Sequence, residues 1–218
     1  MPFYPAEVVI FDCDSTLSAI EGIDELARRA GLYDRLAPLT EAAMDGHIPL
    51  DEVYAKRLEL IKPSHADVAW LGRRYVETMV QDADTVVTAL QKAGKQVHIV
   101  SGGLRSAVLM LASRLGVPEG NVHAVDIRFT RAGEYDGFDE SSPLCRSGGK
   151  KIVCATLAAG RAGAVIIGDA ITDREAMQDG IRFIGFGGVV RRDAVEAAAD
   201  DFIVESTLKA VLERLLPS

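Results

Sequence analysis

Residues 8–17 read Val8-Val9-Ile10-Phe11-Asp12-Cys13-Asp14-Ser15-Thr16-Leu17, a short apolar run followed by two carboxylates and two hydroxyls. The continuous apolar run, rich in β-branched residues, predicts a buried strand. Because side chains alternate along a strand, Asp12 and Asp14 should point the same way, past the end of the sheet. Two carboxylates this close favour a cation between them, and a hard ion such as Mg²⁺ prefers oxygen ligands. A strand end followed by a polar turn explains the same residues, because Asp and Ser are common in turns.

The composition is that of an ordinary soluble globular protein. The 218 residues are 48% hydrophobic and 26% charged, and the chain is long enough for one domain with an insertion. The formal net charge of -8 argues against a general binder of nucleic acid or of an acidic membrane. The same charge would repel an anionic substrate, so a phosphate site requires local positive charge.

The sequence favours the cytoplasm. The first residues lack a basic region and a long apolar segment, which argues against a secretory signal. No apolar run approaches the ~18 residues that a membrane span needs. The cysteines are odd in number and lack zinc spacing, which favours a reducing compartment over a disulfide framework. Cys13 should point away from its neighbouring acids and serve as a small buried apolar side chain.

A helical segment follows Leu17. Apolar residues recur at helical spacing over residues 21–30 and 33–45, and a third helix should end before Pro63. Ser64 and Asp67 resemble a capping box that opens a fourth helix. Because this segment lies between two strand-like pieces, we expect a small helical cap over residues 18–80, inserted into a catalytic core made of residues 1–17 and 81–218.

From residue 84 onward, strands and helices alternate. The predicted strands cover 96–100, 164–168, 182–186 and 201–204, and the helices between them begin near 86, 104 and 149. Residues 125–129 and 134–138, separated by a turn, predict a β-hairpin. This alternation predicts the α/β class: a doubly wound, mainly parallel, Rossmann-like sheet with an inserted helical cap and a hairpin.

Three of the predicted strands end in residues suited to a phosphate or metal site. In a doubly wound sheet the ligand crevice lies at the carboxyl ends of the strands. Those ends are Asp12-Cys13-Asp14, Ser101-Gly102-Gly103 and Gly168-Asp169. The Ser101 hydroxyl and the glycine amides could approach an anion, although Ser-Gly-Gly is also typical of a flexible loop.

Two further residues extend this edge. Lys150 stands at a predicted helix start, where its charge opposes the helix dipole, so a role in holding phosphate is favoured over a structural one. Asp173 lies four residues after Asp169. It either joins the acids or caps the helix that starts near Arg174, and the sequence favours neither.

In sequence order these pieces are Asp-x-Asp-Ser-Thr at 12–16, Ser101, Lys150 and Gly-Asp-x-x-x-Asp at 168–173. Together they resemble the haloacid dehalogenase superfamily of phosphohydrolases. Longer segments are similar to the phosphoserine phosphatase family within it. These segments are 21–27, 43–44, 57–64, 101–106, 133–140, 147–150 and 184–188.

The resemblance implies a Mg²⁺-dependent enzyme that hydrolyses O-phospho-L-serine to L-serine and phosphate, the last step of serine biosynthesis. Asp12 would be the nucleophile that becomes an aspartyl phosphate, and Asp14 the general acid and base. Four residues would hold the phosphoryl oxygens: Ser101, Gly102, Gly103 and Lys150. The Mg²⁺ ligands would be Asp12, the Asp14 backbone carbonyl and Asp169, with Asp173 in support.

The cap would then recognise the serine part of the substrate. Glu21 could bind the ammonium, and Arg57 could bind the carboxylate with its bidentate guanidinium. Glu21 could instead favour its helix start through the dipole, and Arg57 could be a solvated helix residue. Met44 and Thr172 match the family's substrate-contact positions. The chain departs from its relatives at Asp45 and Leu50, near the rim of the expected pocket.

Two other functions stay open. The same aspartyl phosphate could be formed from another small phosphomonoester, or passed to another small hydroxyl compound. A non-catalytic phosphoserine-binding protein is the third hypothesis, and the complete set of acids and Lys150 weigh against it. The expected partner is a small-molecule substrate, without nucleic acid or membrane, and a homodimer is left open.

Overall fold

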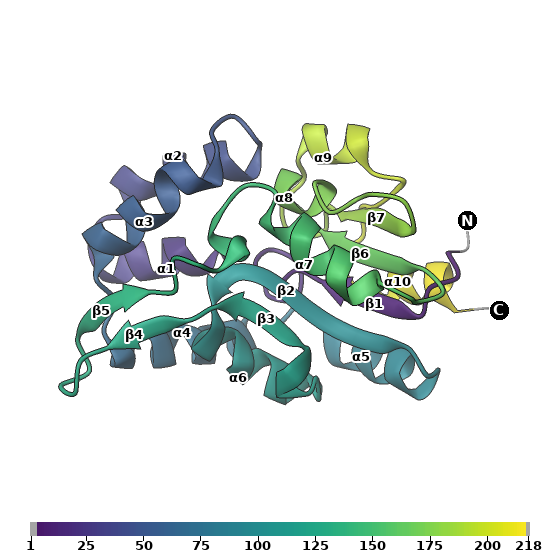
Figure 1. The fold of residues 1–218 in the computed structure, drawn as a ribbon, viewed down its shortest axis with the longest axis horizontal. Coiled ribbons are helices and arrows are strands. Elements are labelled where there is room, and N and C mark those ends of the chain that lie inside the picture. The colour runs from purple at the N-terminus through teal and green to yellow at the C-terminus, as the bar shows by residue number, and fades with distance from the viewer. Residues whose placement is uncertain (1–3, 217–218) are drawn as a thin grey trace.

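The computed structural model describes residues 4–216, which fold around one parallel sheet (Figure 1). Its strand order is β3-β2-β1-β6-β7-β8. The strands are β1 (Val8–Phe11), β2 (Gln96–Leu104), β3 (Val122–Val125), β6 (Ala164–Gly168), β7 (Ile181–Phe186) and β8 (Asp201–Ile203). Both neighbours of β1 pair with it in parallel, β2 on one side and β6 on the other. The predicted α/β class with a mainly parallel sheet is confirmed, and the apolar run at 8–11 forms its buried centre.

Helices cover the two faces of the sheet. In Figure 1, α5 (Ala83–Lys92) and α6 (Arg105–Leu115) lie below the sheet and α7 (Gly149–Ala158) lies above it. Three shorter helices are α8 (Ile171–Arg174), α9 (Asp193–Ala198) and α10 (Lys209–Leu215), and two 3₁₀ turns are η1 (Glu119–Asn121) and η2 (Pro143–Cys145). Because β1 has helices on both sides, its side chains are buried on both faces, which explains its continuous apolar sequence.

Four helices lie between β1 and α5 in the chain: α1 (Gly22–Arg29), α2 (Tyr33–Met44), α3 (Leu50–Ile61) and α4 (His65–Glu77). The predicted all-helical segment is therefore confirmed. The capping box also forms, since Ser64 Oγ accepts from the Asp67 amide (3.2 Å) and the Ser64 amide donates to Asp67 Oδ2 (3.0 Å). Helix α4 packs along α6 of the sheet region. The division into a cap over 18–80 and a core stays a prediction.

The β-hairpin forms from β4 (Ile127–Phe129) and β5 (Tyr135–Phe138), but its predicted start at Val125 is wrong. Val125 instead ends β3, where it pairs with Leu104 of the parallel sheet. The hairpin lies against the helical insertion. The Tyr54 and Phe138 rings are 5.2 Å apart, and the His65 amide donates to the Gly133 carbonyl.

The interpretation of Ser101-Gly102-Gly103 as a flexible loop is also wrong. Strand β2 continues through these residues to Leu104, and its register with β3 shifts between Val100 and Leu104. Leu104 is buried, so the strand gains an apolar anchor beyond the glycines. This part of β2 lies at the carboxyl edge of the sheet, just past the pairing of Ile99 with Phe11 at the end of β1.

Candidate active site

A cavity of about 70 Å³ opens at the carboxyl ends of β1 and β2, between the sheet and the helical insertion. Most of the site residues predicted from the sequence line it together. They are Asp12, Asp14, Glu21, Met44, Arg57, Ser101, Gly102, Gly103, Lys150 and Thr172. The remaining two, Asp169 and Asp173, lie next to Asp12. Of the two departures from the family, Leu50 lines the cavity as well.

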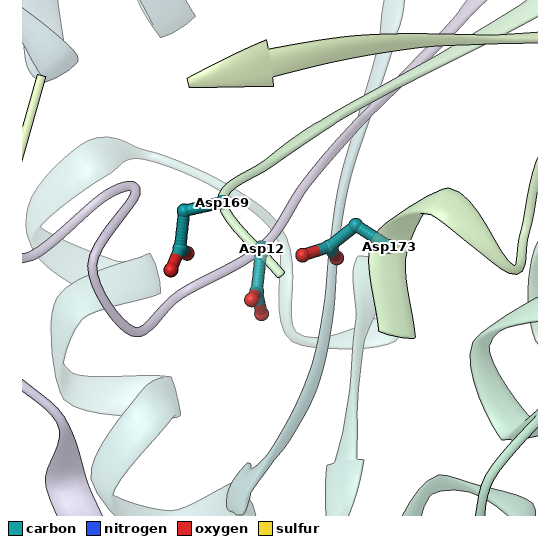
Figure 2. Close-up of side chains that lie close together, drawn as sticks. All are labelled: Asp12, Asp169 and Asp173. Carbon is teal, nitrogen blue, oxygen red and sulfur yellow. The ribbon is translucent and has the colours of Figure 1, made fainter. Parts of the chain in front are cut away.

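Three buried acids meet at this edge. Figure 2 shows the carboxylate of Asp12 between those of Asp169 and Asp173, and one oxygen from each lies within 4.8 Å of the others. Burial, and next the charge of Asp12, raise the pKa of Asp169 well above its usual value and that of Asp173 to about 7. The cluster therefore favours a positive charge among its oxygens. Three carboxylates with no nitrogen or sulfur donor fit a hard divalent ion.

Lys150 supplies part of that positive charge. Its Nζ lies 2.8 Å from Asp12 Oδ2 and 2.6 Å from Asp173 Oδ1. Burial lowers the pKa of Lys150, but the carboxylates of Asp12 and Asp173 outweigh this effect and raise it overall. Lys150 is therefore a fixed cation beside Asp12. Asp173 also accepts from the Ala170 amide at the start of α8, so it both joins the acids and supports a helix start. The predicted helix start near Arg174 is wrong, because α8 begins at Ile171 and ends at Arg174.

Asp14 occupies a different environment from Asp12. Its Oδ1 accepts two hydrogen bonds, from the Gly22 amide (2.6 Å) and from the Tyr75 hydroxyl (2.8 Å). Burial, and next the charge of Asp12, raise the pKa of Asp14 to about 6. A carboxyl group with a pKa near neutrality can both give and take a proton, as a general acid and base must.

The Ser101-Gly102-Gly103 segment forms a further wall of the cavity. Ser101 is fully buried, and its Oγ accepts from the Gly103 amide (2.9 Å). The Tyr54 hydroxyl holds the segment from the insertion side by donating to the Gly102 carbonyl (2.8 Å). The serine hydroxyl and the backbone are thus held in place at the edge where Asp12 and Lys150 lie.

Arg57 brings a buried cation from α3. The side chain is 3% exposed, so its interpretation as a solvated helix residue is wrong. Its Nη1 donates to Thr40 Oγ1 (3.0 Å), and Thr40 Oγ1 lies 2.7 Å from Asp24 Oδ1, to which it can donate. Arg57 Nε has no hydrogen-bond partner among residues 4–216. A buried guanidinium without a directly bonded carboxylate is costly unless a partner arrives, so the site fits an anionic group in the cavity.

Glu21 brings a carboxyl group to the same cavity. The Ser15 hydroxyl donates to Glu21 Oε1 (2.8 Å), and Glu21 makes no side-chain cap at the start of α1. Burial, and next the charge of Asp14, raise the pKa of Glu21 well above its usual value. Because ionised Glu21 is unfavourable among these acids, a cationic group in the cavity would stabilise it.

Other residues of the site carried weaker signals in the sequence. Tyr75 fitted the apolar face of α4, and Thr16 followed the acid pair without a role, although its Oγ1 donates to Asp169 Oδ1 (3.1 Å). Arg192 follows the end of β7, and its guanidinium lies 2.7 Å from Asp45 Oδ1 and 3.5 Å from Asp169 Oδ2. Its position after a strand end was the only signal for it. Cys13 is fully buried, as predicted.

Comparisons with known proteins agree on the kind of molecule. The family model described as haloacid dehalogenase-like hydrolase matches residues 9–178. A phosphoserine phosphatase from Homo sapiens is 40% identical over 205 residues, which cover 93% of this chain and 91% of the relative. A chloroplastic phosphoserine phosphatase from Arabidopsis thaliana is 39% identical over 198 residues, covering 89% and 67% of the two chains. A solved phosphoserine phosphatase, as its phospho-aspartyl intermediate analogue, has the same fold with a TM-score of 0.81 at 24% identity, covering 97% and 100%.

Proposed function

Because the chain belongs to the haloacid dehalogenase-like hydrolases and, within them, to the phosphoserine phosphatase family, we propose that it hydrolyses O-phospho-L-serine to L-serine and phosphate. One observation carries the choice of substrate. The cavity that contains Asp12 and Lys150 is also lined by a buried cation, Arg57, and by a half-buried carboxyl group, Glu21. Phosphoserine has a phosphate, a carboxylate and an ammonium, and these three groups match the three charged parts of the cavity.

The proposed reaction has two steps. Asp12 attacks the phosphorus, the bond to the serine oxygen breaks, and Asp14 gives its proton to that oxygen. In the second step, water attacks the phosphorus of the aspartyl phosphate, Asp14 takes its proton, and phosphate leaves with Asp12 restored. Lys150, Ser101, Gly102 and Gly103 hold the phosphoryl oxygens throughout.

The acid cluster fits a bound Mg²⁺. Its proposed ligands are Asp12, Asp169 and the backbone carbonyl of Asp14, with Asp173 in support. Mg²⁺ bound there would offset the negative charge that Asp12 and the phosphate bring together. Lys150 offsets part of the same negative charge, since it already contacts Asp12 and Asp173.

Recognition of the serine part is assigned to the insertion. Arg57 binds the substrate carboxylate, and Glu21 binds the ammonium. Met44 and Thr172 line the same cavity and complete the substrate contacts. We place the enzyme in the cytoplasm, at the last step of serine biosynthesis, and its free buried cysteines suit a reducing compartment. Residues 4–216 include no helix long and apolar enough to cross a membrane. The homodimer that the sequence left open stays open.

The test is Mg²⁺-dependent phosphate release across a panel of small phosphomonoesters. We expect phosphoserine to be cleaved with the highest kcat/KM, and chelation of the metal to stop release. Equal release from esters without an amino-acid head group would overturn the substrate assignment. Absence of release from every ester would favour the phosphoserine-binding protein.

A further inference from the structure

Tyr75 reaches the cavity from α4, outside every motif that the sequence places at the site. Its side chain is fully buried, yet its hydroxyl donates to Asp14 Oδ1 at 2.8 Å. The Gly22 amide donates to the same oxygen at 2.6 Å. Oδ1 of Asp14 therefore has two donors, whereas no hydrogen bond from the described residues reaches Oδ2.

Two glycines leave the space that the tyrosine hydroxyl occupies. A Cβ on Gly22 would overlap the Tyr75 hydroxyl oxygen, so a larger residue there would push the phenol away from Asp14. A Cβ on Gly103 would lie 3.3 Å from the same hydroxyl and 3.2 Å from Asp14 Oδ2. Burial, and next the charge of Asp14, raise the pKa of the Tyr75 phenol well above its usual value, so the hydroxyl keeps its proton and remains a donor.

We propose that Tyr75 is a positioning residue for the reaction: together with the Gly22 amide it fixes Oδ1 of Asp14 and leaves Oδ2 to face the leaving oxygen of the substrate. This inference rests on the proposed function, in which Asp14 protonates that oxygen. A carboxyl group can turn about its Cβ–Cγ bond, and two donors on one oxygen restrict that turn. Proton transfer depends first on such geometry.

The alternative is that Tyr75 only fills space between α4 and the sheet. The two roles differ in what the hydroxyl does. A packing role resides in the ring, which Tyr75→Phe preserves. A positioning role resides in the hydroxyl and affects only those substrates whose leaving group needs a proton. Serine leaves as an alcohol and needs one, whereas nitrophenolate leaves readily as an anion.

The experiment compares two esters in single-turnover reactions of the Mg²⁺-loaded protein, with enzyme in excess. Release of serine from phosphoserine and of nitrophenolate from 4-nitrophenyl phosphate reports the first step alone. For Tyr75→Phe we expect the serine release rate to fall about tenfold or more, and the nitrophenolate release rate to stay within about twofold of wild type. An equal fall for both esters, or no fall for either, would overturn the inference.

Two further variants serve as a control and as an independent test. Tyr54→Phe removes another hydroxyl that reaches the same cavity but bonds to the Gly102 carbonyl, so it should change both rates by the same factor. Gly22→Ala leaves Tyr75 in the chain but displaces its hydroxyl, so it should reproduce the selective loss of serine release. If Tyr75→Phe does not fold, the Gly22→Ala result decides, and an unselective effect counts against the inference.

Failure of the proposed function gives a different result. If the wild-type protein does not cleave phosphoserine, the substrate assignment falls. Glycerol phosphate, whose leaving group is also an alcohol, then replaces phosphoserine in the same comparison, so the role of Tyr75 is still decided.

Discussion

The two walls of the cavity hold their charges in different ways. On the sheet side, Lys150 contacts Asp12 and Asp173 directly, so opposite charges are already paired. On the insertion side, the hydrogen bonds that the Arg57 and Glu21 side chains make within residues 4–216 go to a neutral hydroxyl, that of Thr40 or Ser15, and neither side chain forms an ion pair there. A wall that is paired in advance is suited to chemistry, because it needs no rearrangement when charge develops. A wall with unpaired charges is suited to recognition, because a substrate supplies the missing partners.

Asp12→Asn is expected to have the largest effect, on the sheet side. An amide cannot act as the nucleophile, so kcat should fall to about one ten-thousandth of wild type or less. The fold should persist, because the change removes a negative charge from a crowded acid cluster. Phosphate release and circular dichroism check the two statements. Turnover at a large fraction of the wild-type value would contradict the assignment of Asp12.

Arg57→Ala tests the insertion side and should be milder. Loss of a buried, charge-assisted pair with the substrate carboxylate should raise KM for phosphoserine roughly 30-fold, which corresponds to about 2 kcal/mol of binding free energy. Phosphoethanolamine, which lacks the carboxylate, is the matched control, and its KM should hardly change. If KM rises equally for both substrates, Arg57 has a structural role and the contrast between the two walls is lost.

Thr40→Val tests how Arg57 is held. Valine keeps the shape of the side chain but removes the hydroxyl that links Arg57 to Asp24. KM for phosphoserine should therefore rise roughly fivefold, which corresponds to about 1 kcal/mol of binding free energy. Thr156→Val is the control, because the Thr156 hydroxyl bonds to a helix carbonyl at the surface. A rise in KM of the same size in both variants would show that the Thr40 hydroxyl does not contribute to substrate recognition.

The smallest effect concerns pH. The pKa of Asp173, about 7 in the metal-free folded protein, lies above its ordinary value of 3.8. The metal-free protein therefore loses stability as pH rises between these values, and a bound cation should replace the lost proton. We expect Mg²⁺ to raise Tm more at pH 8 than at pH 5.5. The difference in its contribution to the free energy of unfolding should be on the order of 1 kcal/mol. Calorimetry with and without Mg²⁺ measures it, and an increase independent of pH would contradict it.

The sheet side could be predicted from the sequence better than the insertion side. Asp12, Ser101 and Asp169 each follow a run of strongly apolar residues, and the topology of parallel sheets brings the ends of such runs together at one edge. Nothing comparable fixes a side chain on an inserted helix. A lone arginine gives no sign of whether it is buried, and Tyr75 occupies an apolar position in α4 that packing alone explains. The course of β2 was missed for a local reason, because paired glycines are typical of loops.

The close fit around the Tyr75 hydroxyl also limits how this chain can change over evolutionary time. Gly22, Tyr75 and Gly103 lie on three elements far apart in the sequence, yet a side chain added at either glycine meets the same phenol. The effects of substitutions at these positions should therefore not add. Replacing Tyr75 by a smaller residue and adding a Cβ at position 22 both break the contact between the phenol and Asp14, so after either change the other should cost less than it would in the present chain. The first change in this group would therefore be the costly one, and a descendant that has survived it is freer to vary at the other positions.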